Sequence, residues 1–269
     1  MTLNRNGAAL ITGASSGIGA AYAERLARRG YDLTLVARNR RRLDALACRI
    51  SDETGRAVEV LEADLTKKED LAPIETILMQ DTRLTMLVNN AGMGTAAPLL
   101  RSDVDTMEKM IGLNVVAATR LTYAAVPAFV ARGNGALINI SSSVAISPEV
   151  LNGVYGGTKA FLLALSQSLH HELAGTGVRV QVVLPGATST EFWDIAGMPL
   201  RDLPAGLVMP VGEMVDAALT GLDLGEFATI PSLPDIADWD AFEAARRKLM
   251  PHLSHAHPAA RYRARPGSP

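Results

Sequence analysis

Short apolar runs alternate with helix-length amphipathic segments along most of the chain, and this alternation limits the folds open to it. Seven runs have the β-branched or leucine-rich character of buried strands; they lie near residues 8, 32, 57, 84, 135, 178 and 227. Apolar residues spaced three to four apart predict the helices between them; these are 20–30, 41–55, 67–80, 103–131 and 152–175. Right-handed crossovers then predict an α/β fold, with one doubly wound parallel sheet and helices on both faces.

One domain spanning residues 1–269 is the simplest interpretation, because no Pro-, Gly- or Ser-rich linker, internal repeat or low-complexity tract divides the chain. Hydrophobic residues make up 48% of it, which is enough for a sizeable core. Residues 188–210 are too long and irregular for an ordinary connection, so we expect a lid in which Phe192 and Trp193 are exposed. The Pro-, Arg- and His-rich residues 251–269 are expected to form a peripheral or disordered tail.

Charge and cysteine content narrow the classes of partner. A formal net charge of -2 gives no field that gathers nucleic acid or anionic lipid, so a small-molecule partner is favoured. Cys48 is the only cysteine, which excludes an intrachain disulfide, and it is expected to be a small buried residue. The first residues lack an apolar signal region, and no stretch reaches roughly 18 uncharged apolar residues. We expect a cytoplasmic protein that binds neither membrane nor nucleic acid.

A glycine-rich loop, TGASSGIG at 12–19, follows the first predicted strand and opens a helix. Gly13 allows a tight turn, Gly17 lets backbone amides approach a pyrophosphate, and Gly19 permits close packing of helix on sheet. The start of the following helix then faces the anion. The sequence therefore predicts a dinucleotide phosphate site, and its residues are Gly13, Ser15, Ser16, Gly17, Ile18 and Gly19.

The same loop also fits the Gly-x-Ser-x-Gly elbow of a serine hydrolase, with Ser15 as nucleophile. That enzyme needs an Asp and then a His in loops after later strands, whereas His170 and His171 fall within a predicted helix. The other three histidines, at 252, 255 and 257, match no defined ligand spacing, so no metal site is predicted. The hydrolase is the less favoured alternative.

The end of the second predicted strand indicates which dinucleotide is bound. Ala37 and Arg38 occupy the place where an acid would bind the ribose 2′-hydroxyl of NAD. A guanidinium matches a 2′-phosphate instead, and Ser15 and Arg42 are placed to help Arg38. NADP(H) is therefore the predicted cofactor, and NAD(H) is less favoured.

Three polar residues near the fifth predicted strand form a candidate catalytic group. Tyr155 and Lys159 are four apart on one helical face, and Ser142 stands at a strand's carboxyl end. A tyrosine titrates near ~10, and bringing its pKa to neutrality requires roughly 4 kcal/mol of help from Lys159 and an oxidised nicotinamide. Tyr155 would then act as general acid or base, while Ser142 hydrogen-bonds the substrate oxygen.

From Ala8 to about Ile230, the chain resembles the short-chain dehydrogenase/reductase family. The matching elements stand in the family's order: TGASSGIG, Asp64-Leu65, NNAG at 89–92, Asn114, Ser142, Tyr155-x-x-x-Lys159 and Pro185-Gly186. The resemblance implies a Rossmann fold, transfer of the 4-pro-S hydride, and a homo-oligomer, dimer or tetramer, built through 103–131 and 152–175. It implies that Asn114 holds a water for proton relay and that Asn90, Ala91 and Gly92 brace the sheet and cofactor.

The resemblance also implies further cofactor contacts. Asp64 and Leu65 would border the adenine; the nicotinamide carboxamide and pyrophosphate would contact Pro185, Gly186, Thr188 and Thr190. The sequence departs from many relatives at Ser143-Val144-Ala145-Ile146, where a bulkier pocket wall is expected. Apolar residues of the lid favour a substrate with some hydrophobic body, and these are Trp193, Ile195, Met198 and Leu207.

These features together predict an NADP(H)-dependent oxidoreductase that acts on a carbonyl or secondary alcohol. The substrate itself is not identified, since the pocket is formed by the least periodic part of the chain. A non-catalytic regulatory protein of the same fold is the alternative from another class. The presence of Asn114, Ser142, Tyr155 and Lys159 together argues against it.

Overall fold

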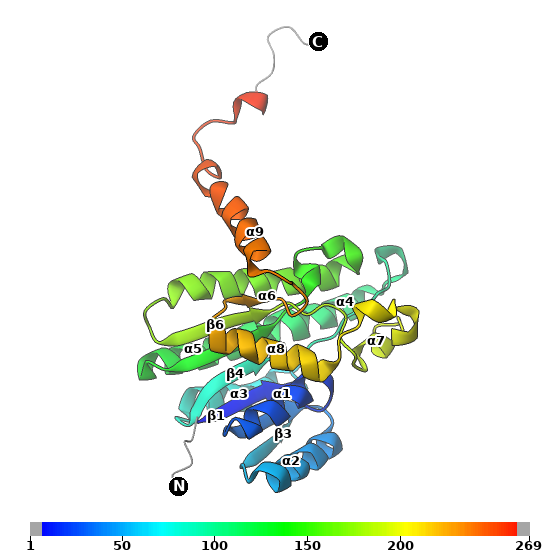
Figure 1. Cartoon of the computed structure of the whole chain (residues 1–269), viewed down its shortest axis with the longest axis vertical. Coiled ribbons are helices and arrows are strands. Elements are labelled where there is room, and N and C mark those ends of the chain that lie inside the picture. Colours follow the sequence, from blue (N-terminus) through cyan, green and yellow to red (C-terminus); the bar gives the residue numbers. More distant parts are fainter. Residues whose placement is uncertain (1–6, 263–269) are drawn as a thin grey trace. The chain divides into compact units, whose positions relative to one another are not determined.

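The computed structural model describes residues 7–262, which divide into two compact units after Pro231. The first unit contains a seven-stranded parallel sheet in the order β3-β2-β1-β4-β5-β6-β7 (Figure 1). Its strands are β1 Ala8–Thr12, β2 Asp32–Ala37, β3 Val58–Glu62, β4 Leu84–Asn89, β5 Gly135–Ile140, β6 Val178–Val183 and β7 Ala228–Thr229. All seven predicted strands and the predicted doubly wound sheet are confirmed.

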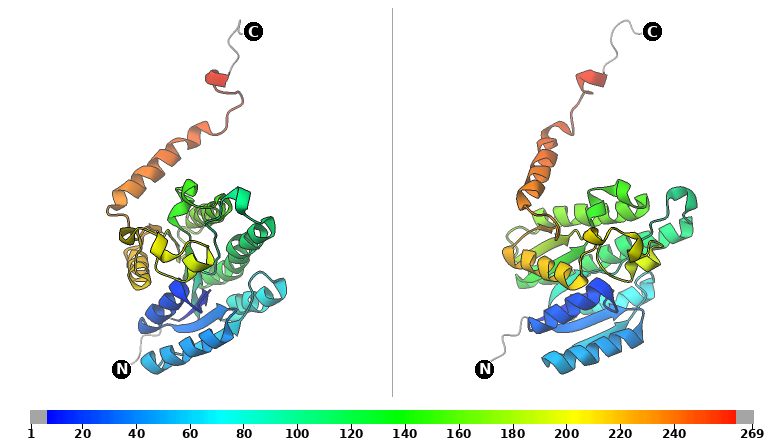
Figure 2. Two further views of the ribbon diagram at one scale, coloured as in Figure 1. Left: turned by 90° about the vertical axis from the view of Figure 1, so that its right-hand side faces the viewer. Right: turned by 45° about the vertical axis from the view of Figure 1, so that its right-hand side comes forward.

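Helices cover both faces of this sheet (Figure 2). One face carries α1 Gly17–Arg28, α2 Arg40–Thr54 and α8 Val211–Leu224, whose buried side chains include Tyr22, Leu43 and Met214. The other face carries α3 Lys68–Gln80, α5 Ala118–Arg132 and α6 Gly153–Glu172, with Leu71, Leu121 and Leu169 among their buried side chains. The apolar faces predicted from residue spacing therefore form two separate cores.

The strand order determines where the candidate site lies. β1 and β4 are neighbours, and Ile11 pairs with both Leu35 of β2 and Val88 of β4. The chain leaves β1 toward α1 on one face and leaves β4 toward α5 on the other, so a crevice opens where the connections diverge. This crevice lies at the carboxyl ends of the strands, where the predicted site residues stand.

The long helix predicted at 103–131 is interrupted. α4 (Val104–Ile111) continues through a π-helical stretch, Gly112–Ala117, into α5. π-Helical turns are rare and often occur at functional sites, and this one contains Asn114. The run Val104–Ala131 is also long and apolar enough on average to cross a membrane, which the sequence analysis did not expect, but half of it is buried within the fold.

A buried polar network fixes α6 to the sheet. The Asn89 side-chain amide of β4 donates to Thr122 Oγ1 of α5 and to Asn139 Oδ1 of β5, each at 3.0 Å. Asn139 Nδ2 in turn donates to Ser166 Oγ of α6 at 2.9 Å. Buried polar groups are stable only when paired, so these bonds favour one register of α6 against the sheet. This register also fixes the positions of Tyr155 and Lys159, which lie near the start of the same helix.

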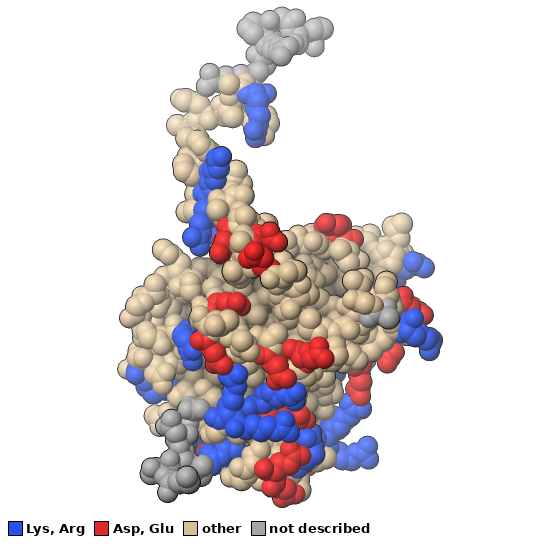
Figure 3. All heavy atoms as spheres, viewed as in Figure 1, with Lys and Arg blue, Asp and Glu red and all other residues tan. Residues whose placement is uncertain are grey.

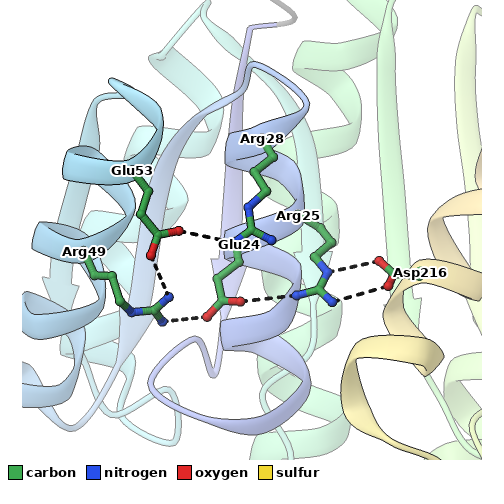
Figure 4. A network of polar contacts seen from close by, with 6 residues as sticks. All are labelled: Glu24, Arg25, Arg28, Arg49, Glu53 and Asp216. Carbon is green, nitrogen blue, oxygen red and sulfur yellow. Dashed lines mark hydrogen bonds and ion pairs between the residues drawn. The ribbon is translucent and has the colours of Figure 1, made fainter.

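Ion pairs connect the three helices on the first face. Basic side chains gather over α1 and α2 with acidic ones among them (Figure 3). Arg25 of α1 binds both carboxylate oxygens of Asp216 on α8, at 3.0 and 3.3 Å. Figure 4 shows the network's six side chains, which are Glu24, Arg25, Arg28, Arg49, Glu53 and Asp216. Such partly exposed pairs contribute at most about 1 kcal/mol each, so they align the helices whereas the cores supply the stability.

Two expectations from the sequence need correction or restriction. Cys48 is exposed, not buried, because α2 turns positions 43, 46 and 50 toward the sheet and position 48 toward solvent. The second unit contains α9 (Ile236–Lys248), a helix that the sequence analysis did not predict, followed by short turns at Met250–His252 and Ala260–Tyr262. The end of the expected tail, 263–269, lies outside the described residues.

Candidate active site

The glycine-rich loop between β1 and α1 requires glycine at three positions. Gly13 and Gly17 adopt φ angles of +66° and +55°, a region that favours glycine. A Cβ on Gly19 would collide with the carbonyl oxygen of Gly13. Among the described residues, no side chain caps α1 at Ser16, so the first backbone amides of the helix remain available to an anion.

The ends of β1 and β4 are tied together by side-chain bonds. Thr12 Oγ1 accepts hydrogen bonds from the backbone amides of Asn90 and Ala91, each at 3.0 Å. Asn90 Nδ2 donates to the Thr12 carbonyl at 2.8 Å. Thr12 was not predicted as a site residue, although a polar residue ending an otherwise apolar strand was a usable signal. It fixes the glycine-rich loop against the Asn90–Gly92 segment.

A hollow of about 320 Å³ lies beside the glycine-rich loop. Ser16 and Gly17 line one side of it, and Thr190 and Glu191 of the 188–210 segment line the other. Thr190 stands close to the loop, since its Cγ2 would lie 3.2 Å from a Cβ on Gly17. The backbone amides and the glycine cradle fit a pyrophosphate group, whereas the hollow continues along α1 to Glu24 and Arg25.

At the neighbouring strand ends, the predicted adenosine contacts have different environments. Arg38 is exposed after β2, next to the buried Ala37. Asp64 closes a turn after β3, where its Oδ1 accepts from the amide and the hydroxyl of Thr66 at 3.1 and 2.8 Å. Leu65 beside it is buried. Arg38 therefore presents a guanidinium at the rim, and the Asp64 turn forms the adjoining wall.

The predicted catalytic residues come together at the start of α6 and the end of β5. Ser142 lies beside Tyr155, close enough to its hydroxyl to lower the pKa of that group, and Ser142 Oγ itself donates to the Pro185 carbonyl at 3.4 Å. Lys159 Nζ lies 5.8 Å from the centre of the Tyr155 ring and donates to the Ile140 carbonyl at 2.9 Å. Ser141 Oγ donates to the Lys159 carbonyl at 2.7 Å, which holds α6 against β5.

Burial shifts both titratable groups toward their neutral forms. It lowers the pKa of Lys159 to about 8. It raises the pKa of Tyr155 to about 12, against a smaller opposing effect of the nearby Ser142 side chain. With this pKa, Tyr155 is a protonated phenol at neutral pH.

Asn114 occupies the π-helical stretch and makes three hydrogen bonds. Its Oδ1 accepts from the Met93 amide at 2.9 Å, and its Nδ2 donates to the Met93 carbonyl at 2.8 Å and to Thr158 Oγ1 at 3.0 Å. A Cβ on Gly92 would lie 3.3 Å from Asn114 Oδ1 and 3.5 Å from Lys159 Nζ. Asn114 and Lys159 thus flank the same glycine. Thr158, which sequence reasoning missed, positions the Asn114 amide.

The 188–210 segment covers Tyr155 with an aromatic ring. Phe192, on the short helix α7 (Phe192–Ile195), has its ring centre 5.7 Å from that of Tyr155. Trp193 was expected to be exposed but is buried, because its Nε1 donates to the Thr188 carbonyl at 2.9 Å. A Cβ on Gly94 would come within 2.5 Å of Phe192 and 2.9 Å of Tyr155. Gly94 was missed because nothing in the sequence marks its contact with Phe192.

The base of this segment is closed by backbone bonds. Thr188 bridges to Met209, whose amide also donates to the Ala187 carbonyl at 2.9 Å. Upstream, the Pro185 carbonyl accepts from the Ser143 amide at 2.9 Å, which joins the Pro185-Gly186 turn to the Ser142 region. The predicted contacts from 185 to 190 therefore line one path from the tyrosine to the glycine-rich loop.

Apolar side chains surround the tyrosine on its remaining sides. Met107, Met110 and Val144 form a buried cluster with Tyr155. Partly buried residues pack against this cluster, and they are Met93, Leu151, Val154 and Phe192. Val144 belongs to the stretch where a bulkier wall was expected. Of the predicted lid residues, Ile195 and Leu207 are exposed and lie outside the cluster.

Comparisons with known proteins agree with this arrangement. A family model described as short chain dehydrogenase matches residues 7–196. The chain belongs to the short-chain dehydrogenase/reductase family. It is 34% identical over 200 residues to a very-long-chain 3-oxoacyl-CoA reductase of Anas platyrhynchos and 36% identical over 193 residues to human 17-beta-hydroxysteroid dehydrogenase type 3. These alignments cover 73% and 68% of this chain but only 64% and 59% of those relatives.

Solved members of the family match almost the whole chain. A short-chain dehydrogenase from Sphingobium yanoikuyae in complex with NADPH is 52% identical, with a TM-score of 0.92, and the match covers 95% of this chain and all of that one. A bulky-bulky ketone specific alcohol dehydrogenase from Comamonas testosteroni is 45% identical, with a TM-score of 0.89, and the match covers 96% and 99% of the two chains. The family resemblance and the fold predicted from the sequence are both confirmed.

The structure offers no support for the hydrolase alternative. Within residues 7–262, no histidine is hydrogen-bonded to Ser15, and His170 and His171 lie in the last turn of α6. Ser15 instead lies in the glycine-rich loop, which falls within the residues, 7–196, that match the short chain dehydrogenase model.

Lys159 makes stability depend on pH in a defined direction. Between pH 8 and 10.5 the unfolded chain binds more protons than the folded one, so the free energy of unfolding rises with pH. Between pH 7 and pH 9.5, the free energy of unfolding measured by urea denaturation should rise by on the order of 1 kcal/mol more in wild type than in Lys159→Gln. Tyr155, with a pKa of about 12, stays protonated across this range. Lys68→Gln, at an exposed site on α3, is the control, and an equal pH effect in both variants would contradict the prediction.

Proposed function

We propose that this protein transfers hydride between NADP(H) and a carbonyl or secondary alcohol, with Tyr155 as general acid and base. The observation that carries the proposal is the placement of Tyr155 beside Ser142 and a buried Lys159, at the same sheet edge as the glycine-rich loop. This arrangement provides a proton donor, an oxygen-binding hydroxyl and a phosphate cradle in one crevice.

NADP(H) fits the residues at this edge. The bound nicotinamide would supply or accept the hydride, through its 4-pro-S position as expected for the family. The cradle of Gly13, Gly17 and Gly19 suits the pyrophosphate, and Arg38 suits the 2′-phosphate. The remaining proposed cofactor contacts are Ser15, Ser16, Ile18, Asp64, Leu65, Asn90, Ala91, Gly92, Tyr155, Lys159, Pro185, Gly186, Thr188 and Thr190. NADPH bound to the Sphingobium relative supports this choice.

In the reductive direction, Tyr155 donates its proton to the substrate oxygen as that oxygen becomes an alkoxide. Ser142 Oγ hydrogen-bonds the same oxygen and orients the carbonyl. In the oxidative direction the phenol must ionise, and a pKa of about 12 places this roughly 7 kcal/mol above neutrality. The positive charge of Lys159 supplies part of that stabilisation. Asn114, beside Lys159 across Gly92, would hold the water that returns a proton from solvent.

A regulatory protein that binds nucleotide without turnover is the alternative. It would have no need for a lysine that is only 6% exposed, since burying an ammonium is costly. Binding of NADPH with no consumption across a broad panel of carbonyl compounds would favour it.

Replacing Tyr155 by Phe removes only the hydroxyl. We expect kcat for ketone reduction to fall by about 10²–10⁴-fold, because the general acid is lost, while the Kd for NADPH changes little. Steady-state absorbance at 340 nm and fluorescence titration measure the two quantities. Tyr123→Phe is the matched control, since Tyr123 is 70% exposed on α5, and it should retain full activity. Unchanged turnover in Tyr155→Phe would contradict the assigned role.

For the substrate, we propose a carbonyl compound with a bulky apolar body. Phe192, Val144 and Met110 give the walls around Tyr155 an apolar character. The flexible thioethers of methionine adapt to varied shapes, so a range of ketones is expected. The ketone specificity in the name of the Comamonas relative supports this class.

Gly94 sets the space between Phe192 and Tyr155. In Gly94→Ala the new methyl would overlap the Phe192 ring, so that ring must shift into the substrate space. We expect kcat/KM for a diaryl ketone to fall at least about tenfold more than for acetone. Gly112→Ala is the control, because a Cβ there meets no described atom within 4 Å. Equal losses for the large and small ketones would contradict this assignment.

We also propose that the protein is a homo-oligomer. Apolar side chains remain exposed along the helical run from α4 to α5, at Val104, Ile111, Val116, Tyr123 and Val130. Exposed apolar faces of this length commonly mark protein interfaces. Light scattering after size exclusion should give a dimer or tetramer, and Tyr123→Glu should shift it toward the monomer. A monomeric wild type at micromolar concentration would contradict the proposal.

A further inference from the structure

Three consecutive arginines, Arg40, Arg41 and Arg42, open α2 without an acidic residue in the first turn. Cations at a helix N-terminus are unfavourable because they face the positive end of the helix dipole. Such a cluster is therefore stabilised by anions that lie nearby. Arg40 has its anion within the helix, since its Nε lies 2.8 Å from Asp44 Oδ1.

Arg42 has a different partner, which lies far away in the sequence. Its Nη1 lies 2.6 Å from Glu191 Oε2 in the 188–210 segment. The Asn39 side chain accepts from the Arg42 amide at 3.0 Å, which holds Arg42 in the first turn of α2, four residues after Arg38. The pair thus joins the expected 2′-phosphate site at the end of β2 to the segment over the active site.

Glu191 lies between two residues that contact opposite ends of the crevice. The residue before it, Thr190, faces Gly17 of the glycine-rich loop. The residue after it, Phe192, packs against Tyr155. A connection from Glu191 to α2 therefore restrains the stretch that spans the cofactor site and the catalytic tyrosine.

We propose that Glu191 is a specificity-determining residue that competes with the cofactor's 2′-phosphate for Arg42. The inference rests on the proposed NADP(H) function. In the free protein, Arg42 binds Glu191; when NADP(H) enters, Arg42 turns to the 2′-phosphate and the 188–210 segment is released from α2. NAD(H) has only a hydroxyl at this position, so it leaves the Arg42–Glu191 pair in place.

The exchange is physically easy. The side chains of Arg42 and Glu191 are 46% and 57% exposed, and pairs in contact with water are weak. A phosphate carries more negative charge than a carboxylate and offers more oxygens to the guanidinium fork.

The test uses adenosine 2′,5′-bisphosphate and AMP, which differ only in the 2′-phosphate and support no turnover. By calorimetric titration, Glu191→Gln should bind the bisphosphate about twofold to fivefold more tightly than wild type, because the competing carboxylate is gone. Its affinity for AMP should stay within about twofold of wild type. Arg42→Ala should weaken bisphosphate binding, and adding Glu191→Gln to it should have no further effect.

Asp44→Asn is the matched control. It removes the partner of Arg40 in the same helical turn, but that pair does not involve the 188–210 segment, so the ratio of the two affinities should not change. Unchanged or weaker bisphosphate binding in Glu191→Gln would overturn the inference. A bisphosphate that fails to bind wild type would contradict the cofactor assignment itself.

A second readout follows the segment directly. Trp193 lies two residues after Glu191, and Trp239 is the only other tryptophan, so Trp239→Phe isolates its fluorescence. The bisphosphate should increase acrylamide quenching of Trp193, whereas AMP should not. Glu191→Gln should show the increased quenching without any nucleotide. Equal quenching in all these states would contradict release of the segment, whether or not the enzyme reduces ketones.

Discussion

The site is arranged around one buried ammonium group. Lys159 is almost enclosed, and such a charge is tolerated only when polar groups surround it. The Ile140 carbonyl accepts from it, and the Ser141 hydroxyl fixes the backbone of its helix turn. Gly92 leaves the space in which Asn114 approaches it. Each of these contacts requires the ends of β4 and β5 and the start of α6 to meet at one point.

The parallel sheet makes that meeting possible. Since the connections from β1 and β4 leave on opposite faces, the glycine-rich loop and α6 flank a single crevice. Thr12 joins the first two strand ends, and the network from Asn89 through Asn139 to Ser166 fixes α6. Side chains far apart in the sequence thus hold their relative positions through buried hydrogen bonds.

Sequence patterns predicted the features that depend on residues close together in the chain. The seven strands and the closeness of Tyr155 and Lys159 followed from residue spacing and the family's motif order. The burial of Trp193 did not, because it depends on a hydrogen bond to Thr188 within a folded irregular segment. The π-helical stretch at Asn114 and the partner of Arg42 also escaped prediction, since both depend on contacts with residues distant in the sequence. The exposure of Cys48 needed only a more careful helical register.

Transfer of label from the cofactor tests the central claim most directly. NADPH carrying deuterium at the 4-pro-S position should be incubated with the protein and a bulky aryl ketone, and the alcohol analysed by mass spectrometry and NMR. The account predicts one deuterium on the carbinol carbon and unlabelled NADP⁺, with product formation strongly reduced in Tyr155→Phe. Alcohol without deuterium would contradict the proposed face of transfer, and equal product from wild type and Tyr155→Phe would contradict the catalytic account itself.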